Sequence, residues 1–127
     1  MMKTSELTGA ALNWAVAKCE GLPKAVDSSG LDGPVIVCGF EQEVLHSQHR
    51  KGQEWKAYQP STDWSQGGPI IEREGIELLC ESLGFCWVAI PQKGPEWRGP
   101  TPLIAAMRCY VASKLGAEVD VPELLEG

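Results

Sequence analysis

Residues 101–116, TPLIAAMRCYVASKLG, constrain the fold of this chain more than any other segment. Thr101 is a natural N-terminal cap, Pro102 is tolerated at the first helical position, and Gly116 provides a stop. The pattern therefore predicts a helix with both ends fixed. Apolar residues extend around much of its axis: Leu103, Ile104, Met107, Cys109, Tyr110, Val111 and Leu115. A helix that is apolar on so many sides must be largely buried, and we expect it to pack against a sheet.

Two further helices and a few strands are predicted. Residues 4–20 show helical spacing, with Thr4 or Ser5 as the cap and Gly21 as the stop. A second helix is expected within residues 61–75. Strand signals occur at 34–40 (PVIVCGF), at 54–59 (EWKAYQ, a short edge strand), and in a hairpin of 76–82 and 85–90.

The remaining segments are predicted to lack regular structure. Turn and loop chemistry dominates residues 24–33, 41–53 and 91–102, and we expect the acidic segment 117–127 to be frayed. Helices and strands that mix in this order predict an α+β fold. We expect a single domain over residues 1–127, with a small sheet of three to four strands and helices packed on its faces.

The charge balance argues against nucleic acid as a partner. The formal net charge is −6, and residues 61–127 carry five Lys/Arg against ten Asp/Glu. Affinity for nucleic acid depends on Lys and Arg neutralising phosphates, so an acidic chain is unsuited to it. A short basic spot occurs only at His49-Arg50-Lys51.

The sequence predicts a cytoplasmic protein. We find no apolar run long enough to cross a bilayer and no signal peptide at the N-terminus. The five cysteines are odd in number and contain no Cys-x-x-Cys pair. In a reducing compartment we interpret them as small apolar core residues rather than disulfide partners.

The stretch YQPSTDWSQGGPIIEREGI, residues 58–76, allows two interpretations. Amide groups around Gly67-Gly68 could form an anion-binding nest, although the Lys-Ser/Thr of a P-loop and the Gly-x-Gly-x-x-Gly spacing are both missing. The favoured interpretation is structural. Ser61 or Thr62 caps a helix, the glycines allow close packing or a break, and Gly75 ends it. Whether the helix continues through Pro69 stays open.

A sharper hypothesis concerns two helix starts. If the starts near residues 61 and 101 lie at the same edge of the sheet, their positive ends and Arg98 would converge on one place. Such a place would attract a carboxylate, a phosphate or a partner surface. The residues predicted to contribute are Ser61, Thr62, Asp63, Trp64, Trp97, Arg98 and Thr101.

Other chemistries find weaker support, and we predict no catalytic residue, metal site or cofactor. His46 and His49, with Cys38 and Glu41 or Glu43, lack the spacing of a standard zinc site. Cysteine catalysis needs a thiol beside a histidine, but the cysteines sit in apolar runs and both histidines in one polar loop. Further pairings are better explained as helix-start and solvated residues or as reduced thiols: Asp63 with Glu72 and Glu74, and Cys80 with Cys86 across the hairpin.

Three motifs together resemble a known family. MKTSELTGAALNWAVAKCEG, YQPSTDWSQGGPIIEREGI and GPTPLIAAMRCYVASKLG are similar to the NinX-like family of bacteriophage and prophage proteins. The order of STDW, W-V and PTPLIAAMRCYVASKLG further resembles the phage domain described as an alpha-beta-alpha sandwich. This resemblance implies a small three-layer sandwich with helices on both faces of the sheet. It also implies a phage accessory role in the cytoplasm of the bacterial host cell and no named catalytic residue. Gly-Gly-Pro departs from the smooth helix of that domain.

Two function hypotheses follow. The first is a non-enzymatic adaptor that binds a phage or host protein, with homo-oligomers as one form of assembly. Tryptophans in polar segments, at Glu54-Trp55 and Glu96-Trp97-Arg98, are typical of contact surfaces, although each ring could equally cover an end of the core. The alternative is a small anionic-ligand-binding protein or minor enzyme that uses the two helix starts and Arg98.

Overall fold

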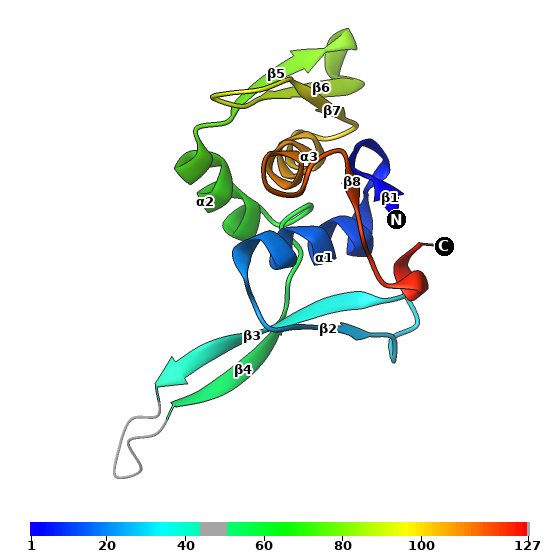
Figure 1. Cartoon of the computed structure of the whole chain (residues 1–127), viewed down its shortest axis with the longest axis vertical. Coiled ribbons are helices and arrows are strands. Elements are labelled where there is room, and N and C mark those ends of the chain that lie inside the picture. Colours follow the sequence, from blue (N-terminus) through cyan, green and yellow to red (C-terminus); the bar gives the residue numbers. More distant parts are fainter. Residues whose placement is uncertain (44–50, 127) are drawn as a thin grey trace.

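Three α-helices and three small antiparallel sheets make up residues 1–43 and 51–126, the part of the chain that the computed structural model describes (Figure 1). The helices are α1 (Gly9–Glu20), α2 (Trp64–Glu74) and α3 (Pro102–Leu115). The sheets contain β1 (Met2–Lys3) with β8 (Glu118–Val119), then β2 (Lys24–Asp27), β3 (Val35–Glu43) and β4 (Lys51–Ala57), and finally β5 (Glu77–Glu81), β6 (Cys86–Ile90) and β7 (Trp97–Gly99). Short 3-10 turns are η1 (Thr4–Glu6), η2 (Ser82–Gly84) and η3 (Glu123–Leu125).

The predicted C-terminal helix is confirmed as α3, and it is the centre of the molecule. The Thr101 side chain caps it, Pro102 opens it and Gly116 follows its last turn. It packs against β5, β6 and β7 on one side and against α1 and α2 on others. Residues 105–111 are all buried, as the apolar pattern around its axis requires.

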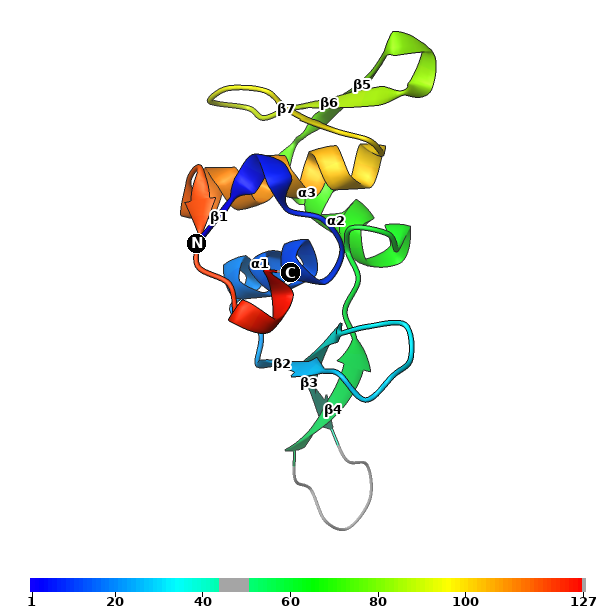
Figure 2. The same cartoon turned by 90° about the vertical axis from the view of Figure 1, so that its right-hand side faces the viewer.

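The two three-stranded sheets lie at opposite ends of the molecule, with the helices between them (Figures 1 and 2). The predicted α+β class is confirmed. The predicted sandwich, a single sheet between two helical layers, is not confirmed, since the strands divide among three sheets. The cause is α3: a helix that is apolar on nearly every side needs cover all around, so sheet and helices both surround it.

The predicted start of the first helix is wrong. Helix α1 begins at Gly9 and ends, as expected, at Gly21 in the left-handed conformation. Thr4 does not cap it, because its hydroxyl donates a hydrogen bond of 2.7 Å to the Gly116 carbonyl at the far end of the chain. A tertiary partner has outcompeted the local cap.

The C-terminal segment is not frayed as predicted. Strand β8 pairs with β1, and Val119, Val121 and Leu125 are buried. Their burial explains why an acidic segment stays ordered, because three apolar side chains leave water there.

Strand predictions are confirmed for β3, for β4 as an edge strand and for the β5–β6 hairpin. Three predicted loops are partly wrong. Residues 24–27 form β2, residues 41–43 and 51–53 extend β3 and β4, and residues 97–99 form β7. All of these additions are short or lie at strand ends, where pairing with a neighbour decides the conformation.

The five cysteines are free thiols. Cys38 and Cys109 are buried in the core as predicted, whereas Cys80 is exposed, contrary to prediction. Burial raises the pKa of the Cys109 thiol to about 11. In the hairpin, Cys80 pairs with Trp87 and Cys86 with Glu81, so the two thiols are not direct cross-strand neighbours.

Candidate functional site

Helix α2 begins one or two residues later than a Thr62 or Ser61 cap would place it. The cap is Asp63, whose Oδ1 accepts hydrogen bonds from the Ser65 amide at 2.9 Å and the Ser65 hydroxyl at 2.6 Å. Ser61 is instead buried, and its amide donates to Asn13 Oδ1 at 3.1 Å. Thr62 is exposed beside it. The first residue of the helix, Trp64, is left 54% exposed.

The open question about the Gly-Gly-Pro sequence is settled: α2 is one helix that includes Pro69 and ends at left-handed Gly75. Gly67 is buried where a Cβ atom would collide with the Pro60 carbonyl oxygen and lie 2.7 Å from Leu103 Cδ2. Gly68 faces open space. Gly67 therefore permits a close approach of α2 to the preceding chain and to α3, which supports the structural interpretation of this motif.

The starts of α2 and α3 meet around one depression. At the second start, Thr101 Oγ1 accepts a hydrogen bond of 3.1 Å from the Ile104 amide. A hollow of about 230 Å³ separates the two starts, and we refer to it as the helix-start hollow; it is lined by Thr62, Trp64, Thr101, Pro102 and Leu103. Three predicted site residues thus come together, while Ser61 lies buried behind and Asp63 acts as the cap.

Trp97 and Arg98 do not join this hollow. They are adjacent in β7, so their side chains point to opposite faces of the sheet. Trp97 packs against the core on the inner face, the face that covers α3. Arg98 lies on the outer face, where it donates to Glu96 at 2.9 Å and to Glu81 at 3.3 Å. These hydrogen bonds raise the pKa of the Arg98 guanidinium.

The electrostatics of the hollow favour apolar contact over anion binding. The carboxylate of Asp63 already sits at the positive end of α2, where a bound anion would have to sit. The Arg98 guanidinium, which was expected to help bind an anion, lies on the outer face and is paired with Glu81 and Glu96. The residues that line the hollow supply hydroxyls, an indole, a proline and a leucine.

A buried cation braces α3 behind this site. Arg108 is charged and buried; its Nε donates to the Leu7 carbonyl at 2.8 Å and its Nη1 to the Arg98 carbonyl at 3.0 Å. Burial lowers the pKa of Arg108. The contact with Arg98 ties β7, the strand that leads into α3, to the helix itself, and the contact with Leu7 ties the segment before α1 to it.

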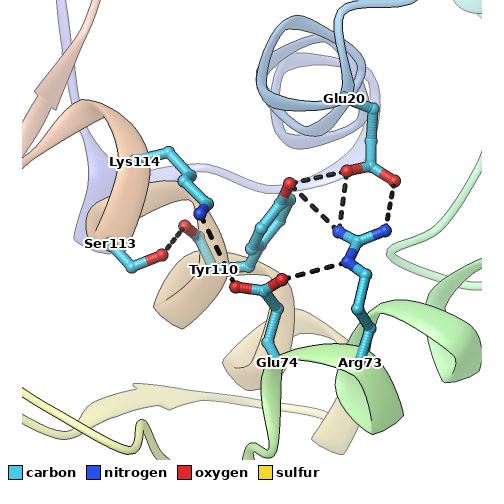
Figure 3. Close-up of polar contacts among 6 residues, drawn as sticks. All are labelled: Glu20, Arg73, Glu74, Tyr110, Ser113 and Lys114. Atoms are coloured by element: carbon cyan, nitrogen blue, oxygen red, sulfur yellow. Dashed lines mark hydrogen bonds and ion pairs between the residues drawn. The ribbon is translucent and has the colours of Figure 1, made fainter.

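Sequence reasoning missed a polar cluster at the other end of α2, the helix-end cluster, formed by Glu20, Arg73, Glu74, Tyr110 and Lys114 (Figure 3). Arg73 binds both carboxylate oxygens of Glu20, at 3.1 and 2.8 Å. The Tyr110 hydroxyl donates to Glu20 at 2.6 Å and accepts from Arg73 at 3.2 Å. Arg73 also binds Glu74 at 3.0 Å. The cluster ties α1, α2 and α3 together.

The pKa shifts in this cluster show how its charges are held. Burial alone would raise the pKa of Glu20, but hydrogen bonds from Arg73 and Tyr110 outweigh it and hold that pKa below its usual value. Burial and the bond to Glu20 raise the pKa of Tyr110. No local signal in the sequence announces the cluster, because its members come from three separate helices. A hollow of about 370 Å³ lies beside it, lined in part by Lys93, Tyr110 and Lys114.

Metal and membrane chemistry gain no support from the described residues. Within 1–43 and 51–126, His, Cys, Asp and Glu side chains form no group of three or more that could hold a metal ion. The candidate ligands His46 and His49, which lack the spacing of a zinc site, lie outside the described residues. Among the helices of that same part of the chain, each is too short or too polar to span a bilayer.

Comparison with known proteins identifies the family. The family described as "Bacteriophage P22, NinX" matches residues 3–114, which is most of the chain. The chain therefore belongs to the phage NinX family, as the three sequence motifs predicted. No curated protein matches it.

Proposed function

We propose that this NinX-family chain is a phage accessory protein that acts as an adaptor by binding a phage or host protein in the host cytoplasm. The helix-start hollow is the proposed contact. The observation that carries the proposal is Trp64, a tryptophan left half exposed at the rim of a preformed depression. Tryptophan is enriched among the residues that dominate protein interfaces, because one rigid ring buries much area at low entropic cost.

The surroundings of Trp64 suit such a contact. Asp63 fixes the backbone on which the indole stands through two hydrogen bonds to Ser65. Gly67 and Arg108 hold the two helix starts in place from behind. A site whose frame is rigid loses little conformational freedom when a partner binds.

The test uses two matched tryptophans. Trp64→Ala removes the proposed anchor, and Trp55→Ala removes an equally accessible indole, 50% exposed, on β4. Proteins that co-purify with the wild-type chain from phage-infected cells would be identified, purified and titrated against each variant by calorimetry. We expect Trp64→Ala to weaken binding by at least about 30-fold, as for an interface hot spot, and Trp55→Ala to leave it unchanged.

Equal affinities for both variants would contradict the proposal.

The alternative, a site for a small anion, is favoured by the meeting of two helix starts at one hollow. It would be tested by titrating inorganic phosphate while following the amide resonances of Thr62 and Thr101 in NMR spectra. Saturable shifts there would support an anion site in place of a protein contact. Light scattering of the purified chain would measure self-association.

A further inference from the structure

The connection between β5 and β6 exposes large apolar side chains to water. Residues 82–85, the hairpin tip, contain Leu83 at 99% and Phe85 at 84% exposure. Leu79, in the adjoining strand, is also exposed. Single exposed apolar residues are ordinary, but three in one hairpin indicate a candidate contact surface.

The backbone of the tip is strained at two residues other than glycine. Ser82 and Leu83 both adopt left-handed conformations, with φ of 53° and 56°, and Gly84 follows with φ of 96°. Only glycine enters this region freely, so Ser82 and Leu83 cost free energy here. The chain accepts that cost at a turn where its own core gains nothing, because both Leu83 and Phe85 remain in water.

The outer face of the β5–β6–β7 sheet continues the tip with an acidic and apolar surface. Strand β5 alternates, so Glu77, Leu79 and Glu81 share this face. Arg98 is their cross-sheet neighbour, and it is already bound to Glu81 and Glu96. Glu96, which Arg98 binds, is counted with Glu77 and Glu81, so three glutamates outnumber one arginine and the patch as a whole is negative.

Charge decides between two occupants of this patch. A second copy that docked tip to tip would bring these glutamates close to their own counterparts, which is repulsive. A different protein that presents an apolar surface edged with Lys and Arg would cover Leu83 and Phe85 and neutralise the surplus glutamates. The complementary charge therefore selects a basic partner over self-association.

We propose that the hairpin tip is a docking element that inserts Leu83 and Phe85 into an apolar surface edged with Lys and Arg on another protein. The cross-strand register places Trp87, close to the tip, beside Gly99, just before the start of α3. The tip and the helix-start hollow thus lie toward the same end of the sheet, and Figure 2 shows the tip and both helix starts on one side. The inference goes beyond the proposed function, because it stands even if the hollow binds nothing.

The test uses two fluorescent peptides of equal length as probes, one of alternating Leu and Lys and one of alternating Leu and Glu. Anisotropy titrations would compare the wild-type chain with Leu83→Ser and Phe85→Ser. Leu31→Ser is the matched control, because Leu31 is fully exposed at 105% in a different turn. Circular dichroism would verify that each variant is folded.

We expect the Leu/Lys peptide to bind at least about tenfold more tightly than the Leu/Glu peptide, with affinity that falls as salt rises. Each tip variant is expected to weaken that binding at least about tenfold, as for residues at the centre of an interface, and Leu31→Ser to leave it unchanged. Amide shifts on binding should centre on residues 79–88 in NMR spectra. Glu77→Lys should weaken the Leu/Lys peptide without removing either apolar side chain.

Three results would overturn the proposal: equal binding of both peptides, binding that survives both tip variants, or dimerisation of the free chain that the tip variants abolish. Two measurements separate the two proposals: capture of the phage or host partner by Trp64→Ala, and binding of the Leu/Lys peptide by the tip variants. If Trp64→Ala abolishes capture of the phage or host partner while the tip variants bind the peptide normally, the proposed function stands and the tip inference fails. If the tip variants lose the peptide while Trp64→Ala keeps the cellular partner, the reverse holds.

Discussion

The two ends of α2 present opposite kinds of surface. At the C-terminal end of α2, Arg73 binds Glu20, Glu74 and Tyr110, so the charged groups there are paired with one another. At its start, Trp64 stands half exposed beside a hollow, and the hairpin tip exposes Leu83 and Phe85 on the same side of the molecule. The polar groups of the helix-end cluster therefore stabilise the fold. The apolar side chains of Trp64, Leu83 and Phe85 are the ones left exposed to water.

The difference separates stability from recognition. A cluster whose charged groups are paired with one another has little left to offer a ligand, whereas removing one member leaves its partners unpaired. Exposed apolar groups contribute little to the folded state and gain when another surface covers them. Substitutions at the two ends should therefore change different measurements.

The largest effect is expected at Gly67, which lies beneath the helix-start hollow. Gly67→Ala should lower the free energy of unfolding by about 2–3 kcal/mol, because a methyl group there meets the Pro60 carbonyl and Leu103. The neighbouring Gly68→Ala should raise it by about 0.5–1 kcal/mol, since its site is open and alanine favours helices. Urea unfolding measures both, and equal effects would contradict the close packing of α2.

The next effect is expected in the helix-end cluster. Glu20→Gln should lower the free energy of unfolding by about 1–2 kcal/mol, because Arg73 loses its ion pair while solvent partly compensates. Glu72→Gln is the control, as Glu72 is an exposed glutamate of the same helix as Arg73. Thermal and urea unfolding provide the measurement. A cluster that served binding rather than stability would show no difference between the two variants.

The same contribution should depend on acid pH. The folded pKa of Glu20 is lowered from 4.5, so its stabilisation is present above the unfolded pKa and is lost as pH falls through the folded pKa. The stability gap between wild type and Glu20→Gln should be constant from about pH 5 to 7 and narrow below pH 4.5. A gap that stayed constant below pH 4.5 would show that the Arg73 and Tyr110 contacts do not depend on the charge of Glu20.

A smaller change is expected at the hairpin tip. Ser82→Gly should raise the free energy of unfolding by about 0.5 kcal/mol, since relief of left-handed strain of about 1–2 kcal/mol exceeds the entropy cost of glycine of about 0.5–1 kcal/mol. Gly84→Ala should have the opposite sign, because Gly84 has φ of 96°. If both substitutions destabilise, the tip is not strained at Ser82.

The smallest effect on stability is expected at the apolar surfaces themselves. Phe85→Ser should change the free energy of unfolding by less than about 0.5 kcal/mol, because its side chain is 84% exposed. Urea unfolding in parallel with Glu20→Gln provides the comparison. A loss as large as that of Glu20→Gln would show that the Phe85 ring supports the fold, and the contrast between the helix-end cluster and the exposed apolar surface would disappear.

The sequence predicted those elements whose caps, stops and turns lie within their own segments. The cap, proline and stop of α3 stand within its own sequence, and the hairpin around Leu83-Gly84 lies between two strand-forming runs. Strands β2 and β7 were missed, because four and three residues form a strand only when a neighbour pairs with them. Thr4 was misassigned because its partner, Gly116, is at the other end of the chain.

The candidate site could be predicted only in part. Two capped starts pointed to Thr62, Trp64 and Thr101, which do line one hollow. Arg98 was placed there because it is near in sequence, but a one-residue step along β7 turns its side chain to the other face. The helix-end cluster needed three helices to be packed before any of its members could be recognised.

The central position of α3 has a consequence for the newly made chain on the ribosome. Both α1 and the β5–β6–β7 sheet bury apolar surface against a helix that begins only at Pro102. Until α3 has left the exit tunnel, α1 and the β5–β6–β7 sheet lack the surface that completes their core. These elements therefore remain partly unfolded during that time. The core around α1 and the β5–β6–β7 sheet should therefore be completed only after residues 102–115 have emerged, which makes the interval before that point the period when chaperones matter most for these elements.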